Sequence, residues 1–381
     1  MEKSRDQILT PAERLDWLRL IRSDNVGPIT FYKLMERFGT AGAALAALPD
    51  LARNGGRKGR LKVATQAAAE REMEALDAIG ARLVGRGEPD YPPLLAHIED
   101  APPLLSILGH AHLLAKKAIA VVGARNSSVN GLGFAEKISR DLGLGRGGQG
   151  GLLVVSGMAR GIDAAAHRGA LATGTVAVVG GGIDVVYPKE NAGLYDQLRA
   201  EGVIVSEIAP GTQPQARHFP RRNRLISGIS RGVVVVEASP RSGSLITARM
   251  ALEQGREVFA VPGAAVDPRA RGTNHLIRQG AILTESAEDV FESLNSASDT
   301  RFEDTKAIDF KEFLPTAPDP DAVGAARDTI KKSLSAAPTS VDEIIRNCQC
   351  SHPVVSWVLL EMELAGRLER HPGNKISMIL N

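Results

Sequence analysis

The stretch AIAVVGARNSSVNG, Ala118 to Gly131, decides the fold class of this chain. It starts as an apolar, β-branched run, passes through a turn of small residues and leads into a helical segment. Similar runs recur along the chain: LLVVSG, TVAVVGG, VIVSE, GVVVVEA, EVFAVPG and AILT. Strands that are apolar at every position, rather than at alternate ones, are covered on both faces. The pattern therefore predicts an α/β core with a mostly parallel sheet between two layers of helices.

The segment before this core is helical. TPAERLDWLRLIRS predicts a helix that begins with a capping box of Thr10 and Glu13 and has Pro11 at its first position. NVGPIT then resembles a helix-hairpin-helix turn, whose backbone amides can meet a phosphate, although a simple interhelical turn is an open alternative. In the next helix, ITFYKLMERFG, the apolar side chains share one face: Phe31, Leu34, Met35 and Phe38. We expect residues 1–84 to form a small helical domain.

The segment after the core, which we assign to residues 85–295, divides into a linker and a third domain. Residues 296–320 are acidic, contain prolines and lack apolar periodicity, as is typical of a linker. In residues 321–381 we expect a helix with a Ser340 and Glu343 capping box, then a second helix and two strands around HPGNK. That order predicts a winged helix.

The expected second helix of the winged helix starts near Pro353 and carries no basic exposed face. We expect its exposed positions to include Ser356, Glu361 and Glu363. This composition favours a structural or protein-contacting role over reading a DNA groove, and regulation through duplex binding is the alternative.

Composition places few limits on function. The formal charge of the 381 residues is +2, so a site for a polyanion must come from local clustering. Cys348 and Cys350 have no zinc-ligand spacing around them, so we expect free thiols, a reducing cytosol and no metal. No apolar run approaches the roughly 20 residues that cross a membrane, and no signal peptide is recognisable, so a cytoplasmic protein is predicted.

The densest positive cluster surrounds FPRRNRLISGIS, Phe219 to Ser230, where no acidic residue lies between Glu207 and Glu237. In an open parallel sheet, ligands bind beyond the carboxyl ends of the strands, where helix N-termini expose unpaired amides. Turns of small residues occur at these ends. They bring further charge, so we predict a phosphate-binding cradle with these cations: Arg125, Arg160, Lys189, Arg217, Arg221, Arg222 and Arg224.

The missing motifs narrow the choice of phosphate compound. The first turn, GARNSS, is no GxGxxG, and the second long strand ends at Ser156 without the carboxylate that a dinucleotide fold needs. No GxxxxGK[ST] loop exists either. Asp163 and Asp184 suit loop bracing, His167 a structural role, and Ser244 a hydrogen bond to phosphate. We therefore expect neither a cofactor nor a catalytic residue.

These motifs resemble the DNA-processing protein A family, also called DprA or Smf. The resemblance covers most of residues 85–295, in the order AVVGARNSS, VVSGMARGIDAAAHRGAL, GGGIDVVYPKEN, FPRRNRLISGIS, VVVVEASPRSGSLITARMALEQGREVFAVPG and GTNHLIRQGA. It implies an extended Rossmann-like parallel-sheet core, an N-terminal helical domain similar to a sterile alpha motif, and a C-terminal winged helix. It also implies a homodimer that forms through the core, binds single-stranded DNA and loads the RecA recombinase during natural transformation.

The residues that match the family's motifs are Arg125, Ser156, Gly157, Lys189 and the arginine-box residues Arg221, Asn223 and Arg224. Arg222 is expected to point the other way, because neighbouring residues at a helix start cannot all face one ligand. Including the turn residues, the predicted DNA-binding set is Gly123, Arg125, Ser127, Ser156, Gly157, Arg160, Gly161, Lys189, Arg221, Asn223, Arg224, Ser242, Gly243 and Ser244. The first turn lacks the aromatic residue that the family often has there.

The leading hypothesis is a single-stranded DNA-binding protein without enzymatic activity. The alternative is a nucleotide-processing hydrolase similar to the lysine-decarboxylase-like phosphoribohydrolases, which have a comparable cradle. Their PGGxGTxxE run is absent from this chain.

Overall fold

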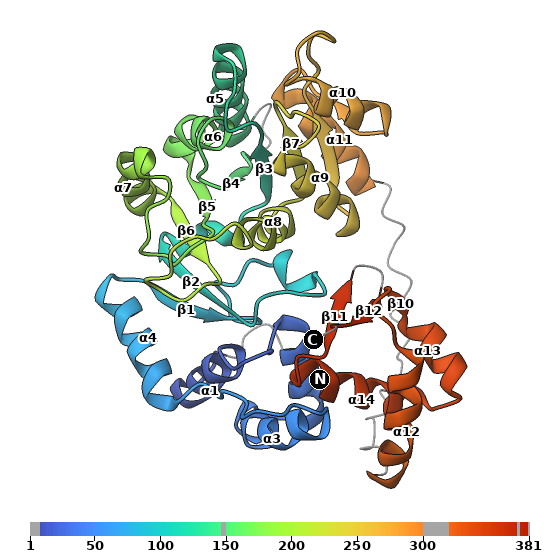
Figure 1. Cartoon of the computed structure of the whole chain (residues 1–381). Helices are drawn as coiled ribbons and strands as arrows, with labels where there is room; N and C mark the ends of the chain where they lie inside the picture. Colours follow the sequence, from blue (N-terminus) through green and yellow to red (C-terminus); the bar gives the residue numbers. More distant parts are fainter. Residues whose placement is uncertain (1–7, 146–149, 300–319, 372–373, 380–381) are drawn as a thin grey trace. The chain divides into compact units, whose positions relative to one another are not determined.

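The computed structural model describes residues 8–145, 150–299, 320–371 and 374–379 (Figure 1). Contacts divide the chain into two compact units, each of which we describe by itself. One unit contains Arg71–Thr305, and the other joins Leu9–Glu70 to Lys306–Asn381. Most of the predicted linker, residues 300–319, lies outside the described residues, while the helix before it reaches Asp299.

The first unit is built on a nine-stranded sheet with the order β1-β2-β6-β5-β4-β3-β7-β8-β9. The seven strands predicted from the apolar runs are present, and all are parallel to their neighbours within that set. They are β3 (Ala118–Val122), β4 (Leu153–Ser156), β5 (Thr175–Val178), β6 (Val203–Ser206), β7 (Gly232–Val235), β8 (Glu257–Ala260) and β9 (Ile282–Leu283).

Two antiparallel strands that the sequence analysis did not predict extend one edge of the sheet. They are β1 (Arg82–Gly85) and β2 (Leu104–Gly109), and β2 pairs antiparallel with β6. The sheet therefore starts at Arg82, a few residues before the expected domain boundary. The helix that precedes it is α4 (Gln66–Ala78).

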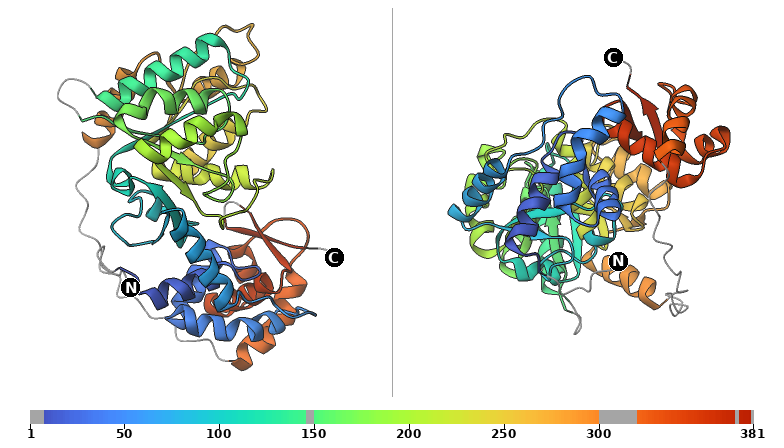
Figure 2. Two further views of the ribbon diagram at one scale, coloured as in Figure 1. Left: turned by 90° about the vertical axis from the view of Figure 1, so that its left-hand side faces the viewer. Right: turned by 90° about the horizontal axis from the view of Figure 1, so that it is seen from below.

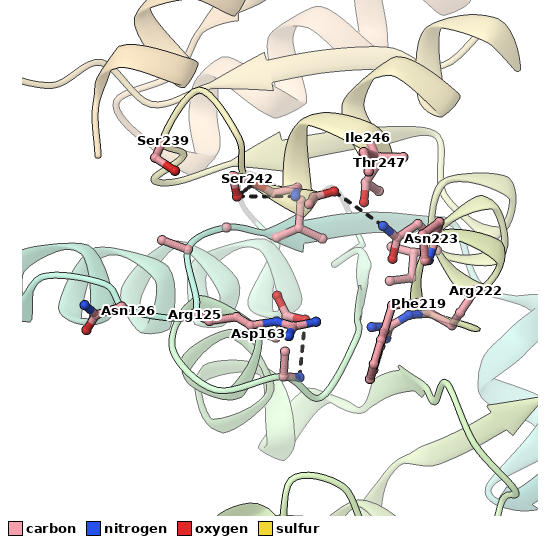
Figure 3. A pocket seen from close by; sticks show the side chains of 18 of the residues that line it. Arg125, Asn126, Asp163, Phe219, Arg222, Asn223, Ser239, Ser242, Ile246 and Thr247 are labelled. Carbon is pink, nitrogen blue, oxygen red and sulfur yellow. Dashed lines mark hydrogen bonds between the residues drawn. The ribbon is translucent and has the colours of Figure 1, made fainter. Parts of the chain in front are cut away.

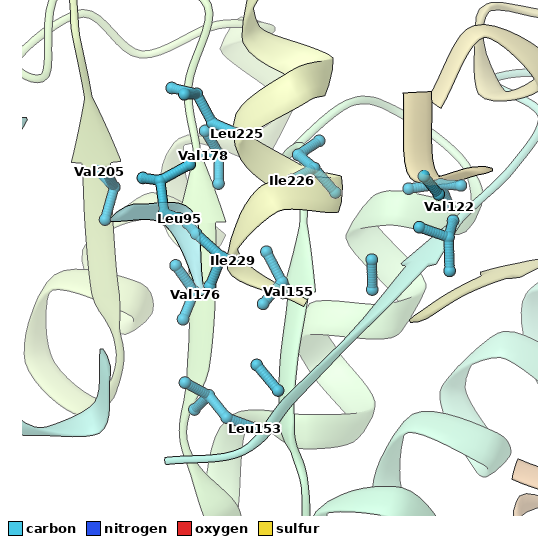
Figure 4. Close-up of a cluster of buried hydrophobic side chains, with 14 of the residues drawn as sticks. Leu95, Val122, Leu153, Val155, Val176, Val178, Val205, Leu225, Ile226 and Ile229 are labelled. Atoms are coloured by element: carbon cyan, nitrogen blue, oxygen red, sulfur yellow. The ribbon is translucent and has the colours of Figure 1, made fainter. Parts of the chain in front are cut away.

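Helices cover both faces of the sheet, as predicted (Figures 1 and 2). Alternate strand residues point to opposite faces, so the central strands β3, β4 and β7 contribute to two cores. One core contains residues of α5 (Val129–Leu144), α6 (Ile162–Ala170) and α11 (Ala287–Asp299). The other core, shown in Figure 4, contains residues of α8 (His218–Ile229), α9 (Gly243–Glu253) and α10 (Arg271–Arg278). A further helix, α7 (Ala192–Glu201), packs beside α6.

The strand order reverses between β3 and β7. Successive strands from β3 to β6 lie on one side of β3, whereas β7, β8 and β9 lie on the other. The chain segments that leave the carboxyl ends of β3 and β7 therefore diverge and leave a crevice between them, which is the usual ligand position in open α/β sheets.

The second unit contains an N-terminal helical domain and a winged helix. The domain comprises α1 (Pro11–Ile21), α2 (Pro28–Phe38) and α3 (Ala41–Asn54). The predicted capping box is present, since the Glu13 amide donates to Thr10 Oγ1 at 3.2 Å and the Thr10 amide donates to Glu13 Oε2 at 2.9 Å. Phe31 and Leu34 are fully buried in the domain core, and Met35 and Phe38 pack against it.

The winged helix agrees with the predicted order of elements and adds one helix, α12 (Pro320–Ser333), that the sequence analysis did not predict. It continues with β10 (Thr339–Ser340), α13 (Val341–Cys348), α14 (His352–Leu364), β11 (Leu368–His371) and β12 (Lys375–Met378). The predicted capping box of Ser340 is wrong, because its side chain makes no cap hydrogen bond. The Val341 amide instead donates to the carbonyl of Asn374 at 3.0 Å, so the tertiary fold satisfies the first amide of α13.

The described residues also bear on the two cysteines, on metal binding and on membrane-spanning helices. Cys348 and Cys350 are both free thiols. The described ranges contain no cluster of His, Cys, Asp or Glu side chains arranged to hold a metal ion. None of the helices in those ranges has the length and apolar character needed to span a membrane.

Candidate functional site

A pocket of about 570 Å³ occupies the crevice between β3 and β7 (Figure 3). Its walls come from five separate segments: the turn after β3, the start of α6, the first turns of α8, the turn between β7 and α9 with the start of α9, and Arg269 in the loop before α10. Six of the predicted site residues line it, namely Gly123, Arg125, Asn223, Ser242, Gly243 and Ser244. The lining also includes Asp163, Phe219 and Arg222, which were not in the predicted set.

The N-terminus of α9 forms one wall of the pocket. Ser242 is the N-cap residue, and its hydroxyl accepts a hydrogen bond from the Ser244 amide and contacts the Ser244 hydroxyl at 2.7 Å. Asn223 on α8 reaches across and donates to the Gly243 carbonyl at 3.4 Å. Amides and hydroxyls at a helix N-terminus suit an anionic group.

Arg125 supplies a full positive charge to the lining of the pocket. Its side chain is exposed, and its guanidinium carbon lies 5.0 Å from the centre of the Phe219 ring. Phe219 in turn contacts Tyr187 with their ring centres 5.7 Å apart, and Tyr187 is 48% exposed. The site therefore places the aromatic pair of Phe219 and Tyr187 near Arg125. The first turn, to which Arg125 belongs, has no aromatic residue itself.

The sequence analysis missed this aromatic pair. Tyr187 belongs to the YPKEN turn and Phe219 to the arginine box, so each residue stood inside a motif that was interpreted only for its charge. The signal that could have revealed them is the low aromatic content, 4% of the chain, which makes an aromatic residue inside a polar motif unusual.

A buried polar layer lies beneath the pocket. Arg222 was expected to point away from the ligand, but it lines the pocket wall, and only 5% of it is exposed. Its Nη1 donates to the carbonyl of Val178, and burial lowers its pKa to about 10 although the Asp163 carboxylate counteracts this. Burial in turn raises the pKa of Asp163, whose carboxylate accepts from the Ala159 amide at 3.3 Å.

His167 belongs to the same buried layer and is neutral. The Thr175 hydroxyl donates to the Val154 carbonyl at 2.7 Å, so it must accept from His167 Nδ1, 2.9 Å away. That places the proton on Nδ1, and Nε2 has no hydrogen-bond partner within the described part of the chain. Burial lowers the pKa of His167 to about 3.

His167 should make the folded state sensitive to acid. Its pKa is near 6.5 in an unfolded chain and about 3 in the fold, so below about pH 6.5 only the unfolded state binds the proton. We expect the free energy of unfolding to fall by about 1.4 kcal/mol per pH unit relative to a His167→Gln variant. Urea midpoints of both proteins between roughly pH 7 and pH 4.5 measure this difference.

The difference between the pH profiles of wild type and His167→Gln isolates the contribution of His167 to the free energy of unfolding. The profile of either protein alone does not. Asp163 has a raised pKa, and its effect on stability therefore has the opposite sign, increasing stability as the pH falls. Parallel pH profiles for wild type and His167→Gln would contradict the assignment.

Four further predicted residues do not line the pocket, and three of them support the turns around it. The Ser156 hydroxyl is buried and donates to the Val121 carbonyl at 2.6 Å. Gly157 lies against the Arg222 guanidinium, where a Cβ would overlap it, and Gly161 has φ +78° and faces the Ala124 carbonyl. Ser127 Oγ is buried without a partner among the described residues.

Three predicted cations are exposed outside the pocket lining. They are Arg160 after β4, Lys189 in the 3-10 turn Lys189–Asn191 and Arg221 on α8. Asn191 donates to the Met158 carbonyl at 2.9 Å, so the turn that holds Lys189 is tied to the turn that holds Arg160. These cations extend the positive edge beyond the pocket.

The structure argues against a DNA contact by Arg224. Its guanidinium pairs with Glu207 and, at 3.2 Å, with Asp100, and it donates to the Asp100 carbonyl at 2.6 Å. Arg224 is 6% exposed and is not among the residues that line the pocket. Its role in the fold is to attach α8 to two loops, and the sequence did not reveal this because both partners are remote in the chain.

The acidic residues near the strand ends brace loops. Asp184 accepts from the Gly211 amide at 2.8 Å, and Glu237 accepts from the amide and hydroxyl of Ser128 at 2.9 and 2.6 Å. Asp163 braces its own turn, as predicted, through the Ala159 amide. Glu207 pairs with Arg224.

This chain is an α/β protein with a Rossmann-like core and a basic, glycine-lined pocket at the point where the strand order reverses. Its family follows from comparison: the chain belongs to the DNA recombination-mediator protein A family, whose model matches residues 82–295. Models described as a DprA-like N-terminal HHH domain and a DprA winged helix domain match residues 11–75 and 314–374. The family and fold class predicted from sequence are thereby confirmed.

Individual relatives agree with this assignment. The chain is 48% identical over 202 residues to the DNA processing protein DprA of Streptococcus pneumoniae, covering 52% of this chain and 70% of that protein. It is 38% identical over 291 residues to the protein Smf of Escherichia coli, covering 76% and 75%.

Two solved structures are also similar. DprA from Streptococcus pneumoniae matches with a TM-score of 0.60 and 36% identity over 75% of this chain and 98% of that chain. DprA from Helicobacter pylori, described with its unique single-stranded DNA binding mode, matches with a TM-score of 0.52 and 25% identity over 57% of this chain and 97% of that chain.

Proposed function

We propose that this chain binds single-stranded DNA along the positive edge of its sheet. The observation that carries the proposal is the position of Arg125 beside the Phe219 and Tyr187 rings at the pocket mouth. A guanidinium serves a phosphate and an exposed aromatic face serves an unstacked base, so one short stretch of strand satisfies both. The relative from Helicobacter pylori, which is described by its single-stranded DNA binding, supports the same conclusion.

The geometry suggests how the strand would lie. One phosphate would meet Arg125 and the amides at the start of α9, while a neighbouring base stacks on Phe219. The exposed cations Arg160, Lys189 and Arg221 would meet further phosphates along the edge. Asn223 lines the pocket and would reach a sugar or base edge.

A titration of labelled oligo-dT at several salt concentrations tests this proposal. The logarithm of the affinity should fall linearly with the logarithm of the salt concentration, with a slope of about −0.7 for each phosphate contacted. A duplex of the same length should bind more weakly, because its bases are stacked internally and unavailable to Phe219. Equal binding of both forms, or an affinity that ignores salt, would sink the proposal.

We further propose that the chain acts without catalysing a reaction. This is supported by the acids near the strand ends, because Asp184, Glu207 and Glu237 accept hydrogen bonds or pair with an arginine that holds the fold together. The phosphoribohydrolase alternative requires one of them to act on a nucleotide. Release of free base from nucleoside monophosphates, abolished by Glu237→Gln, would establish that alternative.

The wider role that we propose is to protect incoming DNA and load RecA during natural transformation, as a homodimer formed through the core. It rests on membership of the DNA recombination-mediator protein A family. RecA should begin to hydrolyse ATP sooner on an oligonucleotide that carries this protein, and sedimentation should report a dimer.

A further inference from the structure

Helix α14 of the winged helix has two apolar faces. Val355, Val358, Leu359 and Met362 belong to the core of the winged helix itself. Leu360 and Leu364 belong instead to the core of the N-terminal helical domain, and Trp357 packs against both cores. A helix that is apolar all around is a buried helix. From Val354 to Leu364 no residue of α14 is exposed, so the expected exposure of Ser356, Glu361 and Glu363 is wrong.

The outer face of α14 lies on the N-terminal domain of the same chain. Leu360 is 3% exposed and Leu364 is fully buried, in a cluster with Leu20, Phe31 and Leu48. Figure 1 shows α14 beside α3, and contacts between the two helices agree with that view. In a DNA-reading winged helix this face would enter a groove.

Polar contacts at the end of α14 involve the hairpin before α2. The Asn25 side chain donates to the Leu364 carbonyl at 2.9 Å, and the Thr30 hydroxyl donates to Glu363 Oε1 at 2.8 Å. Arg370 donates to the second oxygen of Glu363 at 3.0 Å and fixes the carboxylate. Thr30 lies in the first turn of α2, so the negative charge of Glu363 is at a helix N-terminus.

Glu363 thereby lies beside the helix N-terminus at which a nucleic-acid phosphate would bind. The hairpin of a helix-hairpin-helix domain meets a phosphate at the start of its second helix, where amides are unpaired and the helix dipole is positive. Here a carboxylate that Arg370 also holds accepts from the Thr30 hydroxyl in that first turn, and Thr30 is only 1% exposed. A phosphate would have to displace it.

The fit between α3 and α14 is also close in the backbone. Gly55, immediately after α3, approaches the Glu361 carbonyl so closely that a Cβ would overlap it, and the Ala365 Cβ would be 2.9 Å away. The backbone of Gly55 is right-handed, with φ −68°, so only the lack of space demands glycine. In the same loop, Gly59 has nothing within 4 Å of a built Cβ.

We propose that the N-terminal helical domain is the binding partner of α14, and that this docking withholds both the hairpin and α14 from nucleic acid. The proposal is independent of strand binding by the core. It assigns to the winged helix a partner within its own chain, and it makes the two terminal domains a closed module that must open before either contacts DNA.

The docking is tested by cutting the chain between the two domains. A specific protease site is inserted between Lys306 and Ala307, and the cut protein is passed over a sizing column. The fragment that begins at Ala307 should remain bound to the rest of the wild-type protein. It should be released when Gly55→Gln is present and retained with the matched control Gly59→Gln, since only the first side chain meets α14.

Two outcomes overturn the docking: separation of the wild-type fragments, or their retention despite Gly55→Gln. Leu364→Ser weakens the same contact from the side of α14 and must also release the fragment. It thereby shows that release by Gly55→Gln does not come from misfolding of the N-terminal domain. The matched variant Ile345→Ser removes a partly buried side chain from the winged-helix core alone and should leave the fragments together.

A short labelled duplex and the uncut chain test whether the docking keeps the hairpin and α14 away from nucleic acid. Gly55→Gln and Leu364→Ser should bind the duplex about tenfold or more tightly than wild type, because phosphates then reach the hairpin that Glu363 occupied. Unchanged duplex affinity in variants that release the fragment would overturn this part of the proposal. Oligo-dT affinity should not change in any variant, which separates this result from the fate of the core site.

Discussion

Arg125→Ala is expected to weaken oligo-dT binding by about ten- to a hundredfold, the value of a lost charge-assisted hydrogen bond to phosphate. Arg125 is exposed at the mouth of the pocket and lies 5.0 Å from the Phe219 ring. Its loss removes a phosphate contact and a cation beside the aromatic pair. Because phosphates carry no sequence information, the loss should be the same for every oligonucleotide.

Fluorescence anisotropy at several salt concentrations measures this effect, and the salt slope should become shallower by about 0.7. Arg82→Ala is the matched control, because it removes the same charge from β1, where Arg82 pairs with Asp90 at 2.9 Å. If both variants bound alike, the effect would come from net charge alone, and Arg125 would lose its assigned role.

Arg222→Met is expected to destabilise the core unit by about 1–3 kcal/mol, the usual cost of leaving a buried hydrogen-bond acceptor without its donor. Arg222 is 5% exposed, and its pKa of about 10 keeps it charged at neutral pH in spite of burial. Its removal leaves the Val178 carbonyl without this donor and takes away one of the positive charges that act on Asp163. The urea midpoint of the core unit reports the change.

The neighbouring residue provides the control. Arg221 is exposed, so Arg221→Ala should leave the urea midpoint within about 0.5 kcal/mol of wild type. The destabilisation by Arg222→Met should also shrink as the pH falls. Asp163 has a raised pKa in the fold, and a protonated carboxyl no longer needs a cation. A stable Arg222→Met protein at neutral pH would show that the buried layer does not depend on this charge.

The aromatic pair and Arg224 show why a sequence motif alone does not reveal the environment of each of its residues. The arginine box was interpreted as one row of phosphate contacts. In the fold, Arg221 faces solvent, Arg222 is buried under the pocket, and Arg224 pairs with Glu207 and Asp100. Successive helical residues point about 100° apart, so a run of like residues necessarily divides among different environments.

Local chemistry is what the sequence by itself determined. The apolar runs specified the parallel strands, since a strand buried on both faces has no polar positions. Thr10 and Glu13 specified a helix start because their hydrogen bonds close within four residues. The small-residue turns marked the sheet edge where Gly123, Arg125 and Ser242 meet.

Long-range partners are what only the tertiary structure decided. The antiparallel pair β1 and β2, the contact of Phe219 with Tyr187, and the cover that the N-terminal domain places over Leu364 all join segments far apart in the chain. The type of an apolar or charged side chain predicts that it will be buried or paired, but it does not predict the partner. Packing makes that choice, because every surface must be covered at once.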